Sequence, residues 1–440
     1  MSIFRSYDVR GVYGKDITED IMRGIGNALG NHVRSDVVVG RDCRLSSKNL
    51  SAAFIEGVLR AGKDVTDVGE VPLGAGMFYA WREKKEYAFI TASHLPKEWN
   101  GVKFFHANGI GFIEEENMKV RDAYLKGPAA SGKRGSVMKP AWDVLGGYKS
   151  FLLSKSKARK RLKVVLDCGN GMAGMIAPAI FREAGFEVEV LFERPDGNFP
   201  NRSPDQMEDP LNELRKRVVK ADFGIAYDGD GDRMVLVSRL GKKLTPEQSS
   251  YFMLTEILKK ESGPVIANVE CTRAIDVVAE RFNRPLKRIK VGHTFLMENV
   301  HKEKACFGVE VSGHYVVPSM LPFDDSLAVS LYAASVLSSR DGPLEEEIKG
   351  MPVYPFERVN FDCSDQKKFQ VVEGLKKEAG RLGKASFLDG IRVDMDRGWV
   401  LIRASNTGPT IRLTVEGETE KEKEEIKRIF SVMLERAIKG

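Results

Sequence analysis

Residues 223–237, FGIAYDGDGDRMVLV, set an apolar run, an acidic turn and a second apolar run in immediate succession. Three carboxylates stand at alternate positions of the turn, Asp228, Asp230 and Asp232, with a glycine between each pair. The glycines permit the tight turn that would aim three carboxylate oxygens at one centre. Because gathered like charges repel, the turn predicts a hard divalent cation with oxygen ligands. Mg²⁺ suits such a site best, since it usually keeps a place for a substrate phosphate.

Two other interpretations of this turn exist. A solvated acidic turn is the purely structural one. A calcium EF-hand loop shares the D-x-D-x-D beginning, but its sixth position should be Gly and is Arg233, and its twelfth should be Glu and is Arg239. The pattern therefore favours Mg²⁺ over Ca²⁺.

The acidic turn closes one of three similar units. Each unit begins with an apolar strand, continues through a helix-like stretch and a second strand, and ends in a third apolar run, which reads AFITASH, FGIAYDGDGD or FGVEVSGH. Short β-branched runs alternating with helical patterns indicate parallel βαβ units, in which ligands bind beyond the carboxyl ends of the strands. The repeat predicts three similar α/β domains with mixed, mainly parallel sheets.

The pattern changes after about residue 350. A helical stretch over 365–382, alternating strands broken by turn signals at 389–390 and 396–398, and a charged amphipathic helix from about Glu418 indicate a small α+β domain. The predicted domains span residues 1–146, 147–246, 247–350 and 351–440.

The composition excludes several classes of protein. The 440 residues are 42% hydrophobic, enough for several cores, and the net charge of +6 comes from 68 basic and 62 acidic groups. This near balance argues against a nucleic-acid partner and suits small anionic ligands. The five cysteines form neither a C-x-x-C pair nor an even framework, which favours reduced thiols. The charged N-terminus, and the absence of an apolar segment of about 20 residues, predict a soluble cytoplasmic protein without a membrane partner.

The segment TASHLP, residues 91–96, places Ser93 and His94 at the end of the first unit's third apolar run. A serine there can carry a phosphoryl group, and the acidic turn can supply the cation that neutralises it. A Ser-His hydrolase is the competing interpretation, but the serine lacks the G-x-S-x-G pattern and has no assignable third triad member. A helix-capping serine is the structural alternative.

Two further polar strings follow strands in the third and fourth domains. In GVEVSGH, Glu310 can accept hydrogen bonds from sugar hydroxyls, and His314 can move a proton near neutral pH. In RASNTGP, Arg403 stands with hydroxyl and amide donors on a Gly-Pro turn, which predicts an anion site. Structural polar groups and a plain hairpin turn are the respective alternatives, although a hairpin does not need the arginine.

These four strings, in this order, resemble the α-D-phosphohexomutase superfamily, specifically its phosphomannomutase/phosphoglucomutase branch, and the likeness covers essentially the whole chain. FRSYDVRGVYG, VGRDCRLS, DGNFPNRSPD and VGHT match as well. The resemblance implies that the three α/β domains and a mobile α+β domain surround one central cleft. It also implies an isomerase that moves a phosphoryl group between C1 and C6 of mannose or glucose through phosphoserine at Ser93, with hexose 1,6-bisphosphate as intermediate and activator.

The resemblance assigns roles to individual residues. Mg²⁺ would be held by the serine phosphate and the three aspartates, with Arg233 positioning that phosphate. The side chains around the reacting groups would be those of Tyr7, Arg10, His94 and Lys103. The candidates for proton transfer and charge stabilisation are Arg10, Lys103 and His314. The sugar would be held by His293, Glu310 and Ser312, and its non-reacting phosphate by Arg403, Ser405, Asn406 and Thr407.

Three positions depart from the family pattern. Leu95 stands where the family usually has Asn, Glu270 where better-known bacterial members have a lysine near the substrate, and Gly408 where related enzymes have Glu or Thr. A phosphoglucosamine mutase is the nearest alternative function, and Glu270 would favour an amino sugar if it faced the sugar. A serine-nucleophile metallophosphatase and a non-catalytic sugar-phosphate-binding protein are the alternatives from other classes. The sequence does not indicate the oligomeric state.

Overall fold

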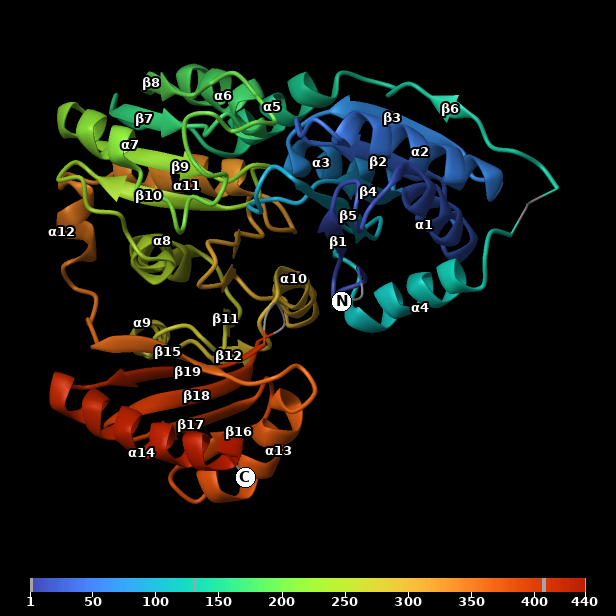
Figure 1. Cartoon of the computed structure of the whole chain (residues 1–440). Helices are drawn as coiled ribbons and strands as arrows, with labels where there is room; N and C mark the ends of the chain where they lie inside the picture. The colour runs from blue at the N-terminus through green and yellow to red at the C-terminus, as the bar shows by residue number, and fades with distance from the viewer. Residues whose placement is uncertain (1–2, 130–131, 406–408, 440) are drawn as a thin grey trace.

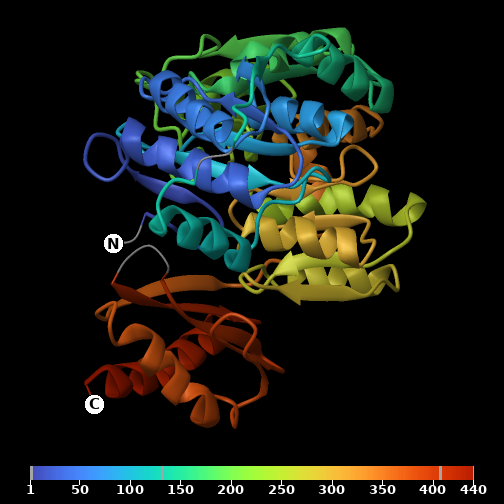
Figure 2. The same cartoon turned by 90° about the vertical axis from the view of Figure 1, so that its right-hand side faces the viewer.

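The computed structural model describes residues 3–129, 132–405 and 409–439. Three domains with mixed sheets form the upper body, and a fourth domain with an antiparallel sheet forms a separate lower lobe (Figures 1 and 2). The predicted fold class, three α/β domains followed by an α+β domain, is confirmed.

Domain I is built on a six-stranded sheet in the order β1-β5-β4-β2-β3-β6. The central β2 runs parallel to β3 and β4, and β5 turns back antiparallel to β4. Its strands are β1 (Val9–Val12), β2 (Val37–Arg41), β3 (Val65–Glu70), β4 (Glu86–Ile90), β5 (Trp99–Phe105) and β6 (Val137–Met138). Its helices are α1 (Glu19–His32), α2 (Ser47–Arg60), α3 (Leu73–Glu83) and α4 (Glu114–Leu125).

Domains II and III repeat the central part of this topology. In domain II, β7 runs parallel to β8 and β9, and β10 returns antiparallel to β9; in domain III, β11, β12, β13 and β14 have the same relations. The strands are β7 (Lys163–Asp167), β8 (Glu187–Leu191), β9 (Phe223–Tyr227), β10 (Met234–Ser238), β11 (Val265–Asn268), β12 (Leu286–Ile289), β13 (Phe307–Val309) and β14 (Tyr315–Val316). The helices are α5 (Val144–Lys155), α6 (Ala177–Glu183), α7 (Asn212–Arg217), α8 (Pro246–Lys260), α9 (Ala274–Arg281), α10 (His293–Lys302), α11 (Ser326–Ser338) and α12 (Leu344–Ile348).

This shared topology gives the three polar strings equivalent places. TASH lies between β4 and β5, DGDGD between β9 and β10, and EVSGH between β13 and β14. In each domain the string connects a buried parallel strand to its antiparallel neighbour. A tight reversal at the end of a buried strand leaves few conformations for its side chains, which suits a site that needs fixed geometry.

Domain IV is an antiparallel sheet in the order β15-β19-β18-β17-β16, with two helices packed against it. The expected amphipathic helix is α14, in which Ile426, Phe430 and Leu434 recur every four residues and enter the domain core. The elements are β15 (Phe356–Asp362), α13 (Lys368–Ala379), β16 (Lys384–Ser386), β17 (Ile391–Met395), β18 (Gly398–Ala404), β19 (Thr410–Gly417) and α14 (Glu420–Lys439). Both helices begin two or three residues later than the pattern predicts.

The packing separates the lower lobe from the body. One continuous hydrophobic core runs through domains I, II and III, whereas domain IV has a core of its own. A small apolar cluster joins the two parts, in which Val269 of domain III meets Trp399 and Leu401. Domain IV is therefore attached to the body mainly by polar contacts.

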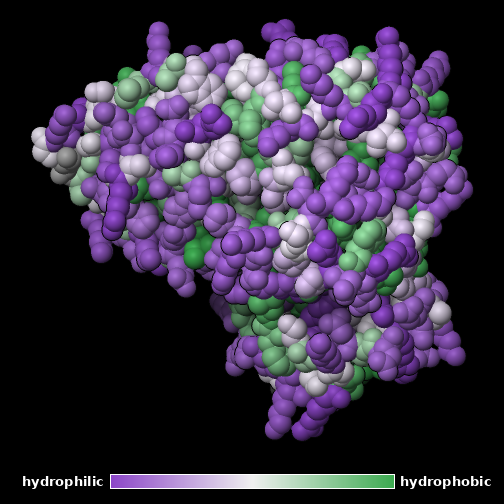
Figure 3. All heavy atoms as spheres, turned by 180° about the vertical axis from the view of Figure 1, so that it is seen from behind, coloured by the Kyte–Doolittle hydropathy of each residue, from purple (hydrophilic) through white to green (hydrophobic). Residues whose placement is uncertain are grey.

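The surface seen from behind is mostly hydrophilic, with scattered hydrophobic side chains (Figure 3). Across the part of the chain that the structure describes, we find no helix both long enough and apolar enough to cross a bilayer. All five cysteines are free thiols.

Candidate active site

Ser93 lies in the turn between β4 and β5 with a φ angle of +52°, which residues other than glycine seldom adopt. Its backbone N–H donates to Thr91 Oγ1 over 2.8 Å. Its side chain is fully buried, and its hydroxyl donates to Asp228 Oδ2 over 2.7 Å. The strained turn therefore points the serine hydroxyl at the acidic turn of domain II.

Arg44 holds this turn in place. The side chain is buried, and Nε donates to Asp42 Oδ2 over 3.1 Å. The two terminal nitrogens donate over 2.6–3.0 Å to four backbone carbonyls of the serine loop, those of Ser93, Leu95, Pro96 and Trp99. Asp42 also accepts from Thr91 Oγ1 over 2.7 Å. Because the guanidinium is planar and all of its hydrogen-bonding directions are used, it fixes the path of the loop.

Asp228, Asp230 and Asp232 are at most 1% exposed, and each offers a carboxylate oxygen within 4.8 Å of the others. The turn closes because the N–H groups of Gly231, Asp232 and Arg233 all donate to Asp228 Oδ1. Oδ1 of Asp230 and Oδ1 of Asp232 are buried without a hydrogen-bond partner among the described residues. Unsatisfied buried carboxylate oxygens are costly, so the turn fits a hard metal cation. The predicted metal ligands thus form one acidic cluster.

Lys103, on β5, reaches the same cluster. Its Nζ lies 3.1 Å from Asp230 Oδ2 and 2.5 Å from Asp232 Oδ2. Burial lowers the pKa of Lys103, but the two carboxylates outweigh burial and hold that pKa above its usual value. Lys103 is therefore a fixed positive charge in this arrangement.

His94 lies beside the nucleophile, with Nδ1 3.4 Å from Ser93 Oγ. Burial, together with the positive charges of Arg233 and Arg10, holds the pKa of His94 well below its usual value. A neutral imidazole can accept a proton, so the serine has a possible proton acceptor at close range.

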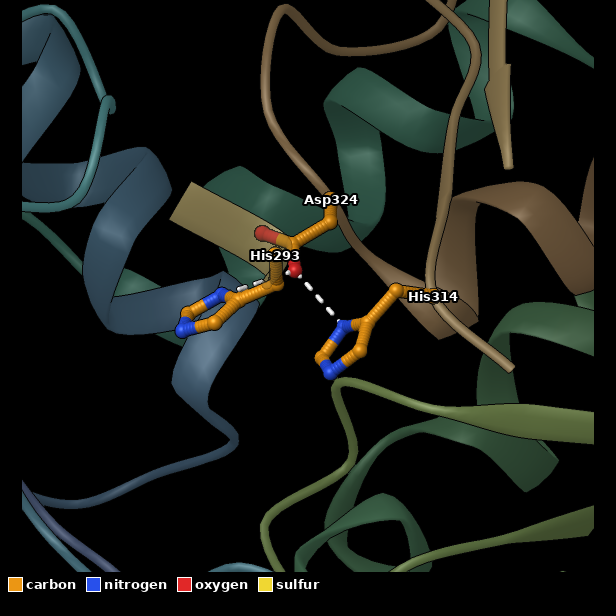
Figure 4. Close-up of side chains that lie close together, drawn as sticks. All are labelled: His293, His314 and Asp324. Carbon is orange, nitrogen blue, oxygen red and sulfur yellow. Dashed lines mark hydrogen bonds and ion pairs between the residues drawn. The ribbon is translucent and has the colours of Figure 1, made fainter. Parts of the chain in front are cut away.

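A second buried cluster contains His293, His314 and Asp324 (Figure 4). Asp324 Oδ2 lies 2.7 Å from Nδ1 of His314 and 3.2 Å from Nδ1 of His293, and the two imidazole rings stack with centroids 5.0 Å apart. Arg233 Nε donates to Nε2 of His314 over 2.8 Å. Burial lowers the pKa of His314, so this imidazole is neutral, with its Nε2 lone pair turned to Arg233. Asp324 thereby orients both histidines.

Glu310 and Ser312, which the resemblance assigns to sugar binding, contact each other. Ser312 Oγ donates to Glu310 Oε2 over 3.2 Å, and the backbone N–H of Gly292 donates to Oε1 over 2.6 Å. Gly292 has a φ of +140°, and a Cβ there would come within 2.8 Å of Tyr7. Burial and the charge of Glu310 raise the pKa of Tyr7 to about 12. Tyr7 thus enters this group as a neutral hydroxyl.

Arg10 belongs to domain I and Arg403 belongs to domain IV. Arg10 Nε lies 2.6 Å from the buried Asp8. Arg403, on β18, donates from Nε to Asp389 Oδ2 over 3.0 Å, and its Nη1 lies 3.7 Å from Glu270 Oε1. Ser405 follows the strand and is buried. Asn406 and Thr407, with Gly408, lie outside the described residues, so their assigned roles stay predictions.

One series of contacts joins the four domains at the site. Ser93 with Asp228 joins domain I to domain II, Arg233 with His314 joins II to III, and Glu270 with Arg403 joins III to IV. All four domain models of one family match the chain in the same order: phosphoglucomutase/phosphomannomutase α/β/α domain I at residues 1–130, domain II at 146–241, domain III at 245–354 and the C-terminal domain at 359–431.

The chain belongs to the phosphoglucomutase/phosphomannomutase family. The predicted family and the enzymatic class are thus confirmed.

Individual proteins of this family resemble the chain along its whole length. A protein named phosphomannomutase/phosphoglucomutase from Pseudomonas putida is 34% identical over 98% of this chain and 95% of its own. A protein named probable phosphoglucosamine mutase from Methanosarcina acetivorans is 32% identical over 100% of this chain and 99% of its own. The crystal structure of a phosphoglucomutase/phosphomannomutase family protein from Burkholderia thailandensis superposes with a TM-score of 0.89 at 29% identity, over 99% of this chain and 97% of that one.

Arg44 and Asp324 are among the site residues that were not predicted. Arg44 stands in VGRDCRLS, a string that contributed to the resemblance without suggesting a role. Asp324 stands in a loop ten residues after His314 and shows no periodic or motif signal. Leu95, one of the departures from the family pattern, contributes its backbone carbonyl to Arg44, which any residue at that position can do.

Proposed function

We propose that this family member is a magnesium-dependent phosphohexomutase in which Ser93 carries the phosphoryl group that moves between C1 and C6 of mannose or glucose phosphates. The observation that carries this proposal is the 2.7 Å hydrogen bond from the buried Ser93 hydroxyl to Asp228 of another domain. A phosphate on that hydroxyl would stand against three carboxylates. A divalent cation between them would relieve this repulsion.

The proposed ligands of Mg²⁺ are Asp228, Asp230, Asp232 and the serine phosphate. The two unpartnered carboxylate oxygens of Asp230 and Asp232 support this assignment. When bound, Mg²⁺ would neutralise charge on the transferring phosphoryl group. Arg233 and Lys103 add fixed positive charge at the same place, which favours transfer because phosphoryl chemistry depends on alignment and neutralisation.

The transfer itself is a simple exchange of bonds. The bond between phosphorus and Ser93 Oγ breaks as a bond forms from phosphorus to the free hydroxyl oxygen of a hexose 1- or 6-phosphate. That hydroxyl loses its proton and Ser93 Oγ gains one, and neutral His94 and His314 are the candidates for carrying protons, with Arg10 and Lys103 stabilising charge. The hexose 1,6-bisphosphate then turns end for end and returns its other phosphate to Ser93. Added hexose 1,6-bisphosphate would act as activator by phosphorylating Ser93.

The substrate would be held at its far end by the third and fourth domains. Glu310 and Ser312 offer acceptors for neighbouring sugar hydroxyls, His293 and Tyr7 lie beside them, and the non-reacting phosphate would meet Arg403, Ser405, Asn406 and Thr407. We place the protein in the cytoplasm as part of the same proposal.

A phosphoglucosamine mutase is the second candidate, because some relatives carry that name. Glu270 would support this candidate if its carboxylate paired with the ammonium group at C2 of glucosamine. Its carboxylate instead lies among three arginines of domain IV, at 3.4–3.9 Å, so its charge is already neutralised. This favours mannose and glucose.

The deciding experiment is Ser93→Ala, assayed with Mg²⁺ and a trace of glucose 1,6-bisphosphate. We expect the purified parent to contain a species about 80 Da heavier, the mass of a phosphoryl group, and the variant to lack both this species and mutase activity. Ser312→Ala is the matched control, because it removes a hydroxyl from the sugar side and should leave the heavier species in place. Full mutase activity in Ser93→Ala would refute the mechanism, and release of inorganic phosphate without any bisphosphate requirement would make the protein a phosphatase.

A further inference from the structure

Asp324 is a buried carboxylate that contacts two histidines of the site at once. One of its oxygens, Oδ2, lies 2.7 Å from Nδ1 of His314 and 3.2 Å from Nδ1 of His293. Burial raises the pKa of Asp324, but the two histidines outweigh burial and hold that pKa below its usual value. The carboxylate is therefore ionised, and in this form it can only accept hydrogen bonds.

This carboxylate determines where both imidazole rings carry a hydrogen. Because an acceptor faces Nδ1 of each ring, Nδ1 carries the hydrogen, and the neutral ring has its lone pair on Nε2. Both Nε2 atoms point away from Asp324 (Figure 4). Nε2 of His314 accepts from Arg233 over 2.8 Å, whereas Nε2 of His293 is buried without a partner among the described residues. His293 therefore offers an acceptor that the rest of the described chain does not use.

The unused Nε2 of His293 belongs to the sugar side of the site. His293 directly follows Gly292, whose backbone N–H donates to Glu310 Oε1 over 2.6 Å. Its ring also meets the ring of Tyr7 edge-on, with the centroids 6.0 Å apart. A lone pair needs a donor, so the substrate group that suits this atom is a sugar hydroxyl. A fully ionised phosphate offers acceptors alone and does not suit it.

The chain that carries Asp324 is firmly held, as a positioning residue requires. The next residue, Asp325, caps the N-terminus of α11 and accepts from the hydroxyl of Tyr148 over 2.7 Å. Ser326 follows, and its hydroxyl donates over 2.7 Å to the carbonyl of Gly231 in the acidic turn. These three consecutive residues therefore keep the two histidines in a fixed relation to the proposed metal ligands.

We propose that Asp324 is a positioning residue that fixes the tautomer of both histidines, so that Nε2 of His293 accepts from a sugar hydroxyl and Nε2 of His314 receives a proton. The proposal rests on the proposed function, which gives the two histidines these roles and assigns Arg233 to the serine phosphate. When the attacking hydroxyl gives its proton to His314, the carboxylate also stabilises the imidazolium that forms. Sugar binding and proton transfer then depend on one buried group.

The test is the tautomer of each ring, read by nitrogen NMR from the full-length protein labelled with ¹⁵N at its six histidines. His293→Gln and His314→Gln assign the two signals. In the parent we expect hydrogen on Nδ1 and a bare Nε2 in both rings. In Asp324→Asn we expect His293 to populate the tautomer with hydrogen on Nε2, since Asp324 provides the one hydrogen bond to its ring in the described chain. His314 should change less, because Arg233 also holds it.

Turnover should separate the two histidines. We expect Asp324→Asn to raise KM about three- to tenfold through His293 and to lower kcat about ten- to a hundredfold through His314. In the His293→Gln background, the same substitution should change KM by less than about twofold. In the His314→Gln background, it should change kcat by less than about twofold. Equal losses in every background would show that Asp324 only supports the fold.

Asp325→Asn is the matched control. It alters the adjacent buried carboxylate, which contacts Tyr148 and, among the described residues, no histidine. We expect a lower melting temperature, with the tautomers of both histidines as in the parent.

Unchanged tautomers in Asp324→Asn would overturn the proposal, and so would an equal change in Asp325→Asn. If Asp324→Asn does not fold, the parent decides alone, because hydrogen on Nε2 of His293 in the parent would contradict the proposed acceptor. The tautomer measurement needs no turnover. A protein with the expected tautomers but without mutase activity would therefore refute the proposed function separately from the positioning by Asp324.

Discussion

Ser93 and the three aspartates are at most 1% exposed, and hydrogen bonds of 2.5–3.2 Å connect them to Lys103, Thr91 and the backbone of the acidic turn. At the other end of the site, three arginines of domain IV lie 3.4–3.9 Å from the carboxylate of Glu270, and their side chains are 10–34% exposed: Arg358, Arg403 and Arg412. The serine end lies between domains I and II, which share one continuous core cluster, whereas the arginine end belongs to a domain with a core of its own.

The difference follows from what each end has to do. Phosphoryl transfer depends on alignment, so a displacement of about 1 Å at the serine end is costly to the rate. The arginine end only has to hold a phosphate, and in the proposed cycle it must hold two different phosphates in turn. Rigid packing therefore surrounds the reacting groups, which need alignment. A more open, positively charged site surrounds the non-reacting phosphate, which only has to be bound and released.

Asp230→Asn, at the serine end, should have the largest effect of the variants proposed here. The carboxylate acts on charge that develops during transfer, so we expect kcat to fall about a hundredfold or more while KM changes little. Removing the metal with a chelator should have a similar effect on the parent, and adding Mg²⁺ should reverse it. Activity that survives both treatments would mean that the serine end does not depend on a metal.

Arg44→Lys tests whether the rigidity of the serine end matters for catalysis. Lysine keeps the charge but cannot donate to Asp42 and four carbonyls at once, so the strained turn at Ser93 should relax. We expect kcat to fall about tenfold to a hundredfold, with KM within about twofold of the parent value.

Arg288→Lys is the comparison variant for this experiment, because it removes a similarly bonded arginine from domain III. It should lower the melting temperature without the loss in kcat. Equal kcat losses in the two variants would show that Arg44 contributes to general stability alone.

Arg403→Ala tests phosphate binding at the arginine end of the site. The lost guanidinium removes a charge-assisted phosphate contact worth about 1.5 to 3 kcal/mol, so KM should rise about ten- to a hundredfold with a small change in kcat. Binding of an unphosphorylated sugar should be much less affected. Equal losses on both ligands would indicate that Arg403 only supports domain IV.

The smallest expected effect concerns the sugar itself. Mannose 1-phosphate and glucose 1-phosphate differ in the orientation of one hydroxyl, and we expect their kcat/KM values to agree within about tenfold, with glucosamine 1-phosphate below both. The arginines around Glu270 motivate this order, since the carboxylate of Glu270 is paired with them and is not available to the ammonium of glucosamine. A glucosamine 1-phosphate value exceeding both by tenfold would reverse the assignment.

The local features of the molecule were predictable from the sequence. Each unit was predicted to begin with an apolar strand, and in β7, the first strand of the second unit, Val164, Val165 and Leu166 are fully buried. The alternation of carboxylates and glycines predicted that Asp228, Asp230 and Asp232 would converge, because the glycines permit a tight turn. Helix starts were predicted less well, since the first turn depends on capping contacts that the apolar pattern does not record.

Partnerships across long separations were decided by the tertiary structure. Arg44 finds its carbonyl acceptors 49–55 residues further along the chain, and Glu270 faces arginines that are 88, 133 and 142 residues away. The sequence by itself determined the three repeated units, the acidic turn and the serine that faces it. These features depend on residues close together in the chain and on a pattern of strands and helices that is repeated. Whether Glu270 would meet a sugar or a cation depended on how domain IV packs against domain III, since an ion pair forms wherever packing brings two charges together and leaves no trace in the local sequence.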